Sequence, residues 1–222
     1  MRRPKALIFD FDGVLLESEF ELNRLTAELL TELGHETTTR DALELFTGLS
    51  GRDVIGAIEG HIGGAVPDLF HERMKDNSRR VLKDGIEEVV GAIRFVRSLP
   101  ADLPKAVASS SSTKWLYGHL DHLGLAQEFG PHVYSGHEHV DRGKPEPDIY
   151  LYAAEQLSVP IAECAIIEDS RVGVTGALAS GARVIGFVGG SHCLDDHQEA
   201  LRSLGATEIA HDFDEVRRLL DL

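Results

Sequence analysis

Short apolar runs and helical repeats alternate along most of this chain. The apolar runs span three to six residues and predict buried strands over 5–10, 106–108, 133–135, 165–167 and 184–188. Between them, apolar residues recur at intervals of three and four, which predicts helices over 86–98, 113–123, 147–157, 171–180, 194–204 and 213–221. Strands that alternate with helices are typical of a parallel sheet covered on both faces. We therefore expect an α/β protein with a doubly wound, Rossmann-like core.

A block without any strand pattern interrupts this alternation after the first strand. From Ser18 the apolar positions Leu22, Leu25 and Leu29 follow the helical period, and Glu21 stands where a capping box with Ser18 would place it. Further helices are predicted over 40–46, 52–62 and 67–83, separated by the glycine-containing segments 48–51 and 63–64. We expect residues 16–84 to form an all-helical cap inserted into a core made of residues 1–15 and 85–222.

Composition and charge exclude several classes of function. The 222 residues carry 22 basic and 37 acidic side chains, a net charge of −15 that argues against nucleic acid or an anionic membrane as a partner. The two cysteines, Cys164 and Cys193, have no CxxC spacing and are expected to be reduced. The apolar segment behind the basic start is too short for a signal peptide, and no run is long enough to span a membrane. We expect a cytoplasmic protein; its oligomeric state is not visible in the sequence.

Polar side chains follow the predicted strands at the points where they end. Asp10 and Asp12 follow the first strand, Ser109 the second, and the pair Glu168 and Asp169 a later one, while Lys144 lies in a loop. Each of these has an ordinary explanation when taken alone: an Asp-Gly turn, a helix cap, or a solvated lysine. Parallel strands end at one edge of the sheet, and ligands of such sheets bind there. Together, these residues predict a site.

The charges of this group indicate what it binds. Two unit charges about 4 Å apart interact by about 4 kcal/mol at an effective dielectric constant of 20. The four carboxylates of Asp10, Asp12, Glu168 and Asp169 would repel one another strongly with only Lys144 nearby, and an all-oxygen site favours Mg²⁺ over zinc. Lys144 and the Ser109 hydroxyl could then hold an anion. The segment around Lys144, Gly143-Lys144-Pro145, is not a P-loop, because proline stands where a P-loop has serine or threonine.

Four motifs, in order, resemble those of the haloacid dehalogenase superfamily. They are Asp10-Phe11-Asp12-Gly13-Val14, Val107-Ala108-Ser109, Gly143-Lys144-Pro145 and Glu168-Asp169-Ser170. The helical insert resembles that of the subfamily containing β-phosphoglucomutase and small sugar-phosphate phosphatases.

The resemblance implies a phosphoaspartyl mechanism on a small phosphorylated metabolite, with Asp10 as nucleophile and Asp12 as general acid and base. It also implies Mg²⁺ held by Asp10, the Asp12 carbonyl and Asp169, with Glu168 in or near the shell. Ser109, the Ser110 amide and Lys144 would bind the phosphoryl group.

Three alternative functions were weighed against phosphate hydrolysis. Dehalogenases proper lack an acid at the position of Asp12, which argues against C–halogen cleavage. Mutase relatives carry a histidine where this chain has Leu22, and their cap arginine falls near Arg52 with an offset of about one residue, so hydrolysis is favoured over phosphosugar isomerisation. A signalling receiver domain would be shorter and would lack the helical insert.

The cap is expected to select the substrate. Arg52 and Lys75 are the candidates to contact the leaving group, although each could equally be a solvated helix charge. The pair His137 and His139 is interpreted as surface, because no third metal ligand is evident beside it.

Overall fold

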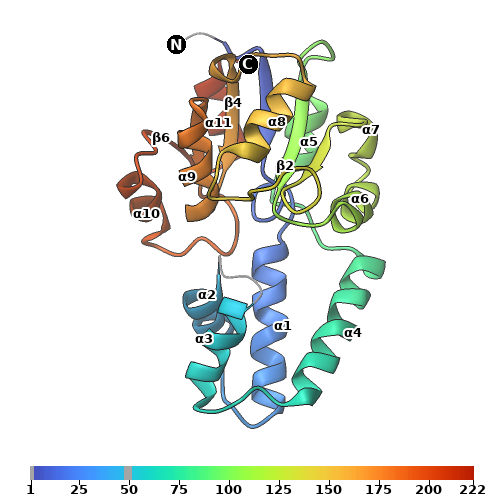
Figure 1. The fold of residues 1–222 in the computed structure, drawn as a ribbon, viewed down its shortest axis with the longest axis vertical. Coiled ribbons are helices and arrows are strands. Elements are labelled where there is room, and N and C mark those ends of the chain that lie inside the picture. The colour runs from blue at the N-terminus through green and yellow to red at the C-terminus, as the bar shows by residue number, and fades with distance from the viewer. Residues whose placement is uncertain (1–2, 48–51) are drawn as a thin grey trace.

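A six-stranded, fully parallel sheet forms the centre of the larger part of the molecule (Figure 1). The computed structural model describes residues 3–47 and 52–222. The strand order is β3-β2-β1-β4-β5-β6, so β1 lies in the middle with later strands added on both sides. The strands are β1 (Ala6–Phe9), β2 (Lys105–Ser109), β3 (Val133–Ser135), β4 (Cys164–Glu168), β5 (Arg183–Phe187) and β6 (Glu208–Ala210). The predicted doubly wound α/β fold is confirmed.

Helices cover both faces of this sheet. They are α5 (Ala92–Arg97), α6 (Thr113–His122), α7 (Ala126–Phe129), α8 (Asp148–Gln156), α9 (Arg171–Ser180), α10 (His197–Ser203) and α11 (Phe213–Leu220). Successive side chains of a strand point to opposite faces. In β1, Leu7 and Phe9 accordingly pack with α5, α6, α7 and α11, whereas Ala6 and Ile8 pack with α8 and α9. A central strand buried on both sides explains why its sequence is an unbroken apolar run.

The four helices that follow β1 lie together beyond one edge of the sheet (Figure 1). They are α1 (Ser18–Glu32), α2 (Thr39–Phe46), α3 (Arg52–Ile62) and α4 (Asp68–Asp84). They share a separate apolar cluster around Leu30, Phe46, Ile58 and Phe70. This cluster lets the inserted helices pack on one another, as the helical periodicity of the segment predicts. The glycine-containing segment 48–51, predicted to separate two of these helices, lies outside the described residues.

Two sequence predictions in the region that joins the two parts are wrong. Ser18 does not cap α1: the N-cap residue is Glu17, and the Ser18 hydroxyl donates instead to Asp12. The predicted helix over 86–98 is helical only in α5, because residues 87–89 pair with the segment leaving β1. Glu17 donates its backbone N–H to Glu87, and Val89 donates to Leu15. The outgoing and returning chains are thus tied together.

Smaller differences concern short elements. The sequence pattern did not predict β6, α7 or a 3₁₀ turn over Ile161–Glu163. The helix predicted from residue 194 begins at His197. Three or four residues contain too little of a repeat to distinguish a strand or a single turn from a loop. Among the described residues, no helix is both long and apolar enough to cross a bilayer.

Candidate active site

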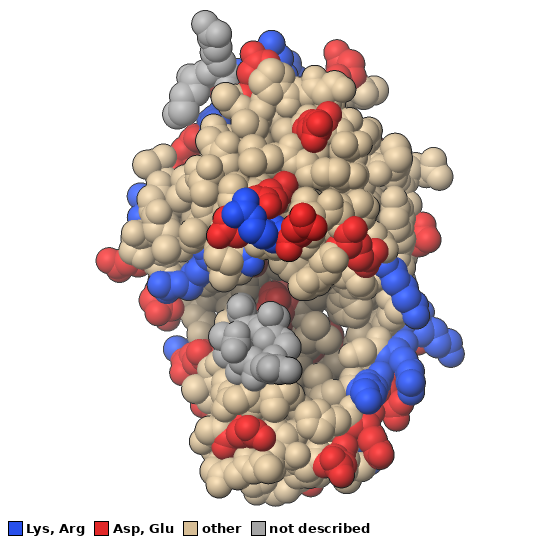
Figure 2. All heavy atoms as spheres, in the orientation of Figure 1, with Lys and Arg blue, Asp and Glu red and all other residues tan. Residues whose placement is uncertain are grey.

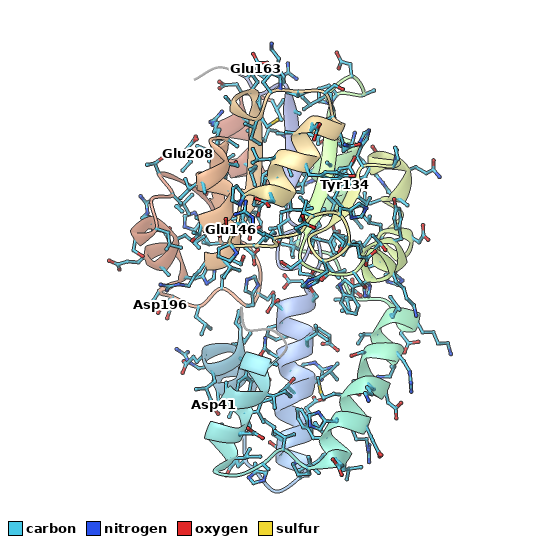
Figure 3. All side chains as sticks on the ribbon, in the orientation of Figure 1. Asp41, Tyr134, Glu146, Glu163, Asp196 and Glu208 are labelled. Carbon is cyan, nitrogen blue, oxygen red and sulfur yellow. The ribbon has the colours of Figure 1, made fainter. Side chains whose placement is uncertain are left out.

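The polar residues predicted to form a site meet at the carboxyl edge of the sheet. Asp10 follows β1, Glu168 ends β4 with Asp169 next to it, and Ser109 ends β2. Register pairs bring these ends level, because Phe9 lies opposite Val107 on one side and Ile167 on the other. Figure 3 shows which end of the sheet faces the inserted helices: Glu163, just before β4, lies far from these helices, whereas Glu146, close to Lys144 in sequence, lies nearer to them. Figure 2 shows a hollow between the two parts of the molecule.

Lys144 reaches from its loop into the centre of this group. Its side chain is only 3% exposed, and its ammonium Nζ lies 2.7 Å from Asp10 Oδ1 and 2.8 Å from Glu168 Oε2. Burial opposes the charge of this lysine, but the two carboxylates keep its pKa well above the ordinary value. Lys144 therefore remains a cation inside the site, and it links the ends of β1 and β4.

Both oxygens of Glu168 are fully engaged by hydrogen-bond donors. Oε2 accepts from Lys144 and from the Tyr150 hydroxyl at 2.8 Å, and Oε1 accepts from the Ser170 amide and hydroxyl at 2.9 and 2.7 Å. Burial alone would favour the neutral acid, but Lys144 and Ser170 lower the pKa of Glu168. Glu168 is thus an ionised carboxylate whose contacts fix the direction of Lys144.

Asp169 differs from Glu168 in having an unused oxygen. Its Oδ2 lies 2.8 Å from His192 Nε2, whereas Oδ1 is buried without a hydrogen-bond partner among the described residues. The approach is so close that a Cβ on Gly13 would lie 2.1 Å from Oδ2, and Gly13 has φ +80°, a conformation that favours glycine. The glycine of the first motif therefore gives Asp169 its place beside Asp10.

The carboxylates of this group fit a hard cation. Asp10, Glu168 and Asp169 are buried, and each offers an oxygen within 4.8 Å of the others. Burial, and then the charge of Glu168, raise the pKa values of Asp10 and Asp169 well above normal. A divalent cation would favour the ionised forms, and the free Oδ1 of Asp169 is a suitable ligand atom. Because Glu168 already accepts four hydrogen bonds, Asp10 and Asp169 are the better placed of the three.

Asp12 lies in a different environment, surrounded by neutral donors. Its Oδ1 accepts from Ser18 Oγ at 2.6 Å and Trp115 Nε1 at 2.9 Å, and its Oδ2 accepts from Ser111 Oγ at 2.6 Å and Ser109 Oγ at 3.2 Å. These donors come from the start of α1, from the end of β2 with the loop that follows it, and from α6. Asp12 is therefore oriented by both the core and the first inserted helix.

The remaining predicted site residues lie outside this cluster or outside the description. Ser110 follows β2 and is exposed. Arg52 begins α3, but its side chain is not among the described parts of the structure. His137 is exposed and His139 half-buried; the imidazole of His139 is hydrogen-bonded to the backbone of Ser135. Within the described parts of the chain, the groups able to hold a metal include neither histidine.

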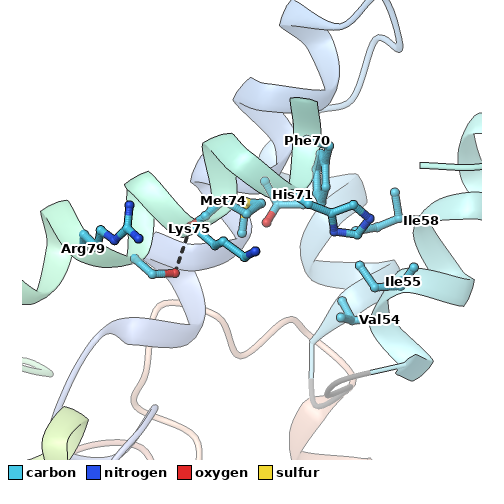
Figure 4. Close-up of a pocket in the computed structure, with 10 residues that line it drawn as sticks. Val54, Ile55, Ile58, Phe70, His71, Met74, Lys75 and Arg79 are labelled. Atoms are coloured by element: carbon cyan, nitrogen blue, oxygen red, sulfur yellow. Dashed lines mark hydrogen bonds between the residues drawn. The ribbon is translucent and has the colours of Figure 1, made fainter. Parts of the chain in front are cut away.

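Lys75 lines a pocket within the inserted helices (Figure 4). The cavity has a volume of about 390 Å³ and is formed by α1, α3 and α4. One wall of the pocket is polar and the other is apolar. The polar side chains, all on α4, are His71, Lys75, Ser78 and Arg79. The apolar side chains are Val54, Ile55, Ile58, Phe70 and Met74. Basic side chains gather along this side of the molecule in Figure 2, where α4 carries Arg73, Lys75, Arg79, Arg80 and Lys83.

Sequence reasoning missed the residues that support the cluster from elsewhere. Tyr150 binds Glu168, Trp115 binds Asp12, and His192 and His197 contact Asp169. Each comes from a helix or loop with no motif of its own. One signal was available: Trp115 and Tyr150 occur early in helices that follow strands, where side chains can reach the carboxyl edge of the sheet.

The comparisons with known proteins agree with this geometry. Residues 7–187 match the family described as haloacid dehalogenase-like hydrolase. A phosphorylated carbohydrates phosphatase from Thermotoga maritima is 32% identical over 92% of this chain and 93% of its own length. Hexitol phosphatase A from Escherichia coli is 30% identical, covering 82% of each chain. Among solved structures, a HAD family hydrolase from Deinococcus radiodurans with bound phosphate and sodium is 31% identical. It covers 99% of this chain and 96% of its own, with a TM-score of 0.88.

Proposed function

We propose a specific function for this chain, which belongs to the haloacid dehalogenase-like hydrolases and is a phosphatase. It hydrolyses a small phosphorylated sugar or related metabolite in the cytoplasm. The reaction requires Mg²⁺ and passes through a phosphoaspartyl intermediate. The observation that carries this proposal is the buried group in which Lys144 joins Asp10 and Glu168 while Asp169 keeps one oxygen free. An arrangement of this kind combines a carboxylate nucleophile with positive charge at the place where a phosphoryl group must bind.

In the first step, Asp10 attacks phosphorus and forms an acyl phosphate while the bond to the leaving alkoxide breaks. Lys144 lies 2.7 Å from Asp10 and is positioned to neutralise the phosphoryl oxygens as charge moves onto them. The Ser109 hydroxyl and the Ser110 amide are the proposed further contacts to these oxygens. Mg²⁺ would be held by Asp10, the Asp12 carbonyl and Asp169, with Glu168 beside them. When bound, the ion supplies charge stabilisation of the phosphoryl oxygens.

Asp12 is the proposed general acid and base. In its protonated form it donates a proton to the leaving oxygen, and the resulting carboxylate then takes a proton from the water that attacks phosphorus of the acyl phosphate. Inorganic phosphate is released and the Asp10 carboxylate is restored. While no substrate is bound, the donors around Asp12 hold its carboxylate in one orientation. We propose that binding of a substrate draws Asp12 away from some of them, because a carboxyl group must face the leaving oxygen to transfer a proton.

We propose that residues 16–84 form the cap that selects the leaving group, on a core of residues 1–15 and 85–222. Support comes from the pocket beside Lys75, whose apolar and basic walls suit a small polar molecule that also carries negative charge. Arg52 remains a second candidate contact. The names of the curated relatives, which include sugar-phosphate phosphatases, favour the same substrate class.

Hydrolysis is preferred over phosphosugar isomerisation for a reason visible at Leu22. This residue stands where mutase relatives carry a histidine, and its side chain packs against the apolar core of the sheet domain. An aliphatic residue cannot transfer or relay a proton. A hexose 1-phosphate should therefore yield free phosphate faster than it yields the 6-phosphate.

The proposal is tested by phosphate release from a panel of sugar phosphates and an aryl phosphate, with Mg²⁺ and after EDTA. We expect Mg²⁺-dependent turnover, and we expect Asp10→Asn to lower kcat by at least about 10⁴-fold, as removal of a covalent nucleophile typically does. Asp102→Asn is the matched control, because Asp102 is exposed in the turn before β2, at the opposite edge of the sheet. Full activity of Asp10→Asn, or turnover that survives EDTA, would disprove the mechanism.

A further inference from the structure

Two histidines and a cysteine meet beside the carboxylate cluster but are not used by the proposed reaction. His192 and Cys193 lie in the loop between β5 and α10, and His197 is the first residue of α10. Each offers a ring nitrogen or a sulfur, and these atoms all lie within 4.8 Å of one another. His192 is buried, whereas Cys193 and His197 are only partly so, which leaves an approach from the surface.

The spacing of these atoms matches tetrahedral zinc. With Zn–S near 2.3 Å and Zn–N near 2.05 Å, the tetrahedral angle separates sulfur from nitrogen by about 3.5 Å. The separation of Cys193 Sγ and His192 Nε2 is 3.4 Å. Thiolate and imidazole ligands select zinc-class ions, whereas Mg²⁺ prefers oxygen ligands. The ligand set therefore differs in kind from the adjacent carboxylates.

A second observation concerns the other nitrogen of the His192 ring. Nδ1 is buried without a hydrogen-bond partner among the described residues, and the residue as a whole is only 2% exposed. Buried polar atoms are nearly always paired, so an unpaired one indicates a missing water, ion or other partner. The loop itself is fixed, because the amide and hydroxyl of Ser191 both donate to Glu17. A fixed loop holds its ligands in place before an ion arrives.

We propose that His192, Cys193 and His197 form a binding site for Zn²⁺ or a similar ion, separate from the Mg²⁺ site. A fourth ligand is available in water or in Asp169, whose Oδ2 lies 2.8 Å from His192 Nε2. Both histidines contact Asp169, since His197 Nε2 lies 2.7 Å from its carbonyl oxygen. Ligation would take the histidines away from these contacts and draw Asp169 toward the zinc. Zinc should then oppose Mg²⁺ at the neighbouring site.

Cobalt absorption tests the binding directly, without any enzyme assay. Co²⁺ titrated into the reduced, metal-free full chain should produce a thiolate-to-cobalt charge-transfer band, and Zn²⁺ should abolish it by displacement. Cys193→Ser should lose the band and weaken zinc binding at least tenfold, since even residues that only orient ligands typically contribute about 10–100-fold. Cys164→Ser is the matched control, because Cys164 is a buried free cysteine at the start of β4, the end of the strand opposite to Glu168.

His197→Gln should also weaken the band, and thermal melting of each variant shows that it is folded. A wild-type protein without the band, or a band retained in Cys193→Ser, would overturn the site. A further measurement rests on the proposed phosphatase activity: zinc added with saturating Mg²⁺ should inhibit the wild type at least tenfold more strongly than Cys193→Ser. Equal inhibition would disprove the link to Asp169, whereas the cobalt band tests the site even if the phosphatase assay fails.

Discussion

The carboxyl edge of the sheet and the pocket in the inserted helices differ in how far their lysine side chains are buried and paired. At the sheet edge, Lys144 is 3% exposed and held between two buried carboxylates. In the pocket, Lys75 is exposed and faces an apolar wall from α3 and α4. Buried charges with fixed partners form a rigid site that suits one invariant group, the phosphate. An exposed lysine beside apolar surface can adapt to different leaving groups. The first region is therefore suited to chemistry and the second to selection.

The strongest test of this comparison removes the buried lysine. Lys144→Met keeps the length of the side chain but leaves Asp10 and Glu168 without their cation, and breaking a buried ion pair typically costs about 3–5 kcal/mol of stability. We expect at least about a 10³-fold loss of kcat/KM, because an electrostatic contact to the transferring group is lost. Urea unfolding and steady-state kinetics measure the two effects. Lys83→Met, at an exposed position of α4, is the control.

The stability loss in Lys144→Met should depend on pH. Lys144 lowers the pKa of Glu168, so the stabilisation from this pair is present above the pKa of the unfolded chain and lost as pH falls through the folded value. Because the ordinary pKa of glutamate is about 4.3, the difference in unfolding free energy between wild type and variant should be larger at pH 6 than at pH 3. A difference that does not change with pH would show that the pair contributes by packing alone.

Magnesium should stabilise the sheet edge increasingly as pH rises. Burial and Glu168 raise the pKa values of Asp10 and Asp169, so without a cation their ionisation lowers stability as pH rises toward the folded values. Mg²⁺ at about 100 times its Kd adds about 2.7 kcal/mol, and each kcal/mol raises the Tm of a chain this long by about 2–4 °C.

Thermal melts with Mg²⁺ or EDTA measure this shift, which should be larger at pH 8 than at pH 5.5. Asp169→Asn should reduce it, whereas Lys75→Met should not, because Lys75 lies in the cap pocket. A shift of equal size at both pH values would contradict the raised pKa values of the two carboxyl groups.

The sheet edge was predictable from the sequence and much of its support was not. Short apolar runs predict the strands, and ligands of parallel sheets bind at the carboxyl ends of strands. These two observations predict from the sequence alone that Asp10, Ser109 and Asp169 lie together. The contacts of Trp115 and His192 were not predicted, because they depend on how a helix and a loop fold back over the strand ends. Local sequence carries no record of such approaches.

The wrong prediction at Ser18 has the same cause. Serine followed three residues later by glutamate is typical of a capping box, and within the helix alone that interpretation is reasonable. In the folded chain the Ser18 hydroxyl binds Asp12, a charged acceptor that competes with the helix amides. Residues 86–91 likewise have helical spacing, but residues 87–89 pair with the chain leaving β1. Long-range partners overrode local preference where the inserted helices join the sheet.

A smaller effect is expected in the pocket. Lys75→Met removes a positive charge at an exposed site, where a single ionic contact is screened by water, so kcat/KM for a preferred sugar phosphate should fall by only about fivefold. The loss should appear mainly in KM, and hydrolysis of an aryl phosphate should change less. Steady-state kinetics on both substrates provide the measurement, with Lys83→Met again as the control on the same helix. An equal loss for both substrates would contradict a role in selection.

A comparably small effect is expected at Ser18, where the two regions meet. Ser18 and Ser111 each donate to Asp12 at 2.6 Å, but Ser18 begins the first cap helix and Ser111 belongs to the core. If movement of the cap and placement of Asp12 are coupled, Ser18→Ala should lower kcat by about two- to tenfold, the range of one net hydrogen bond. Ser111→Ala should lower it less, because α1 still holds Asp12. Single-turnover kinetics of both variants measure this difference. Equal losses would mean that Asp12 needs only a donor, whichever part of the molecule supplies it, and that movement of the inserted helices does not control the placement of Asp12.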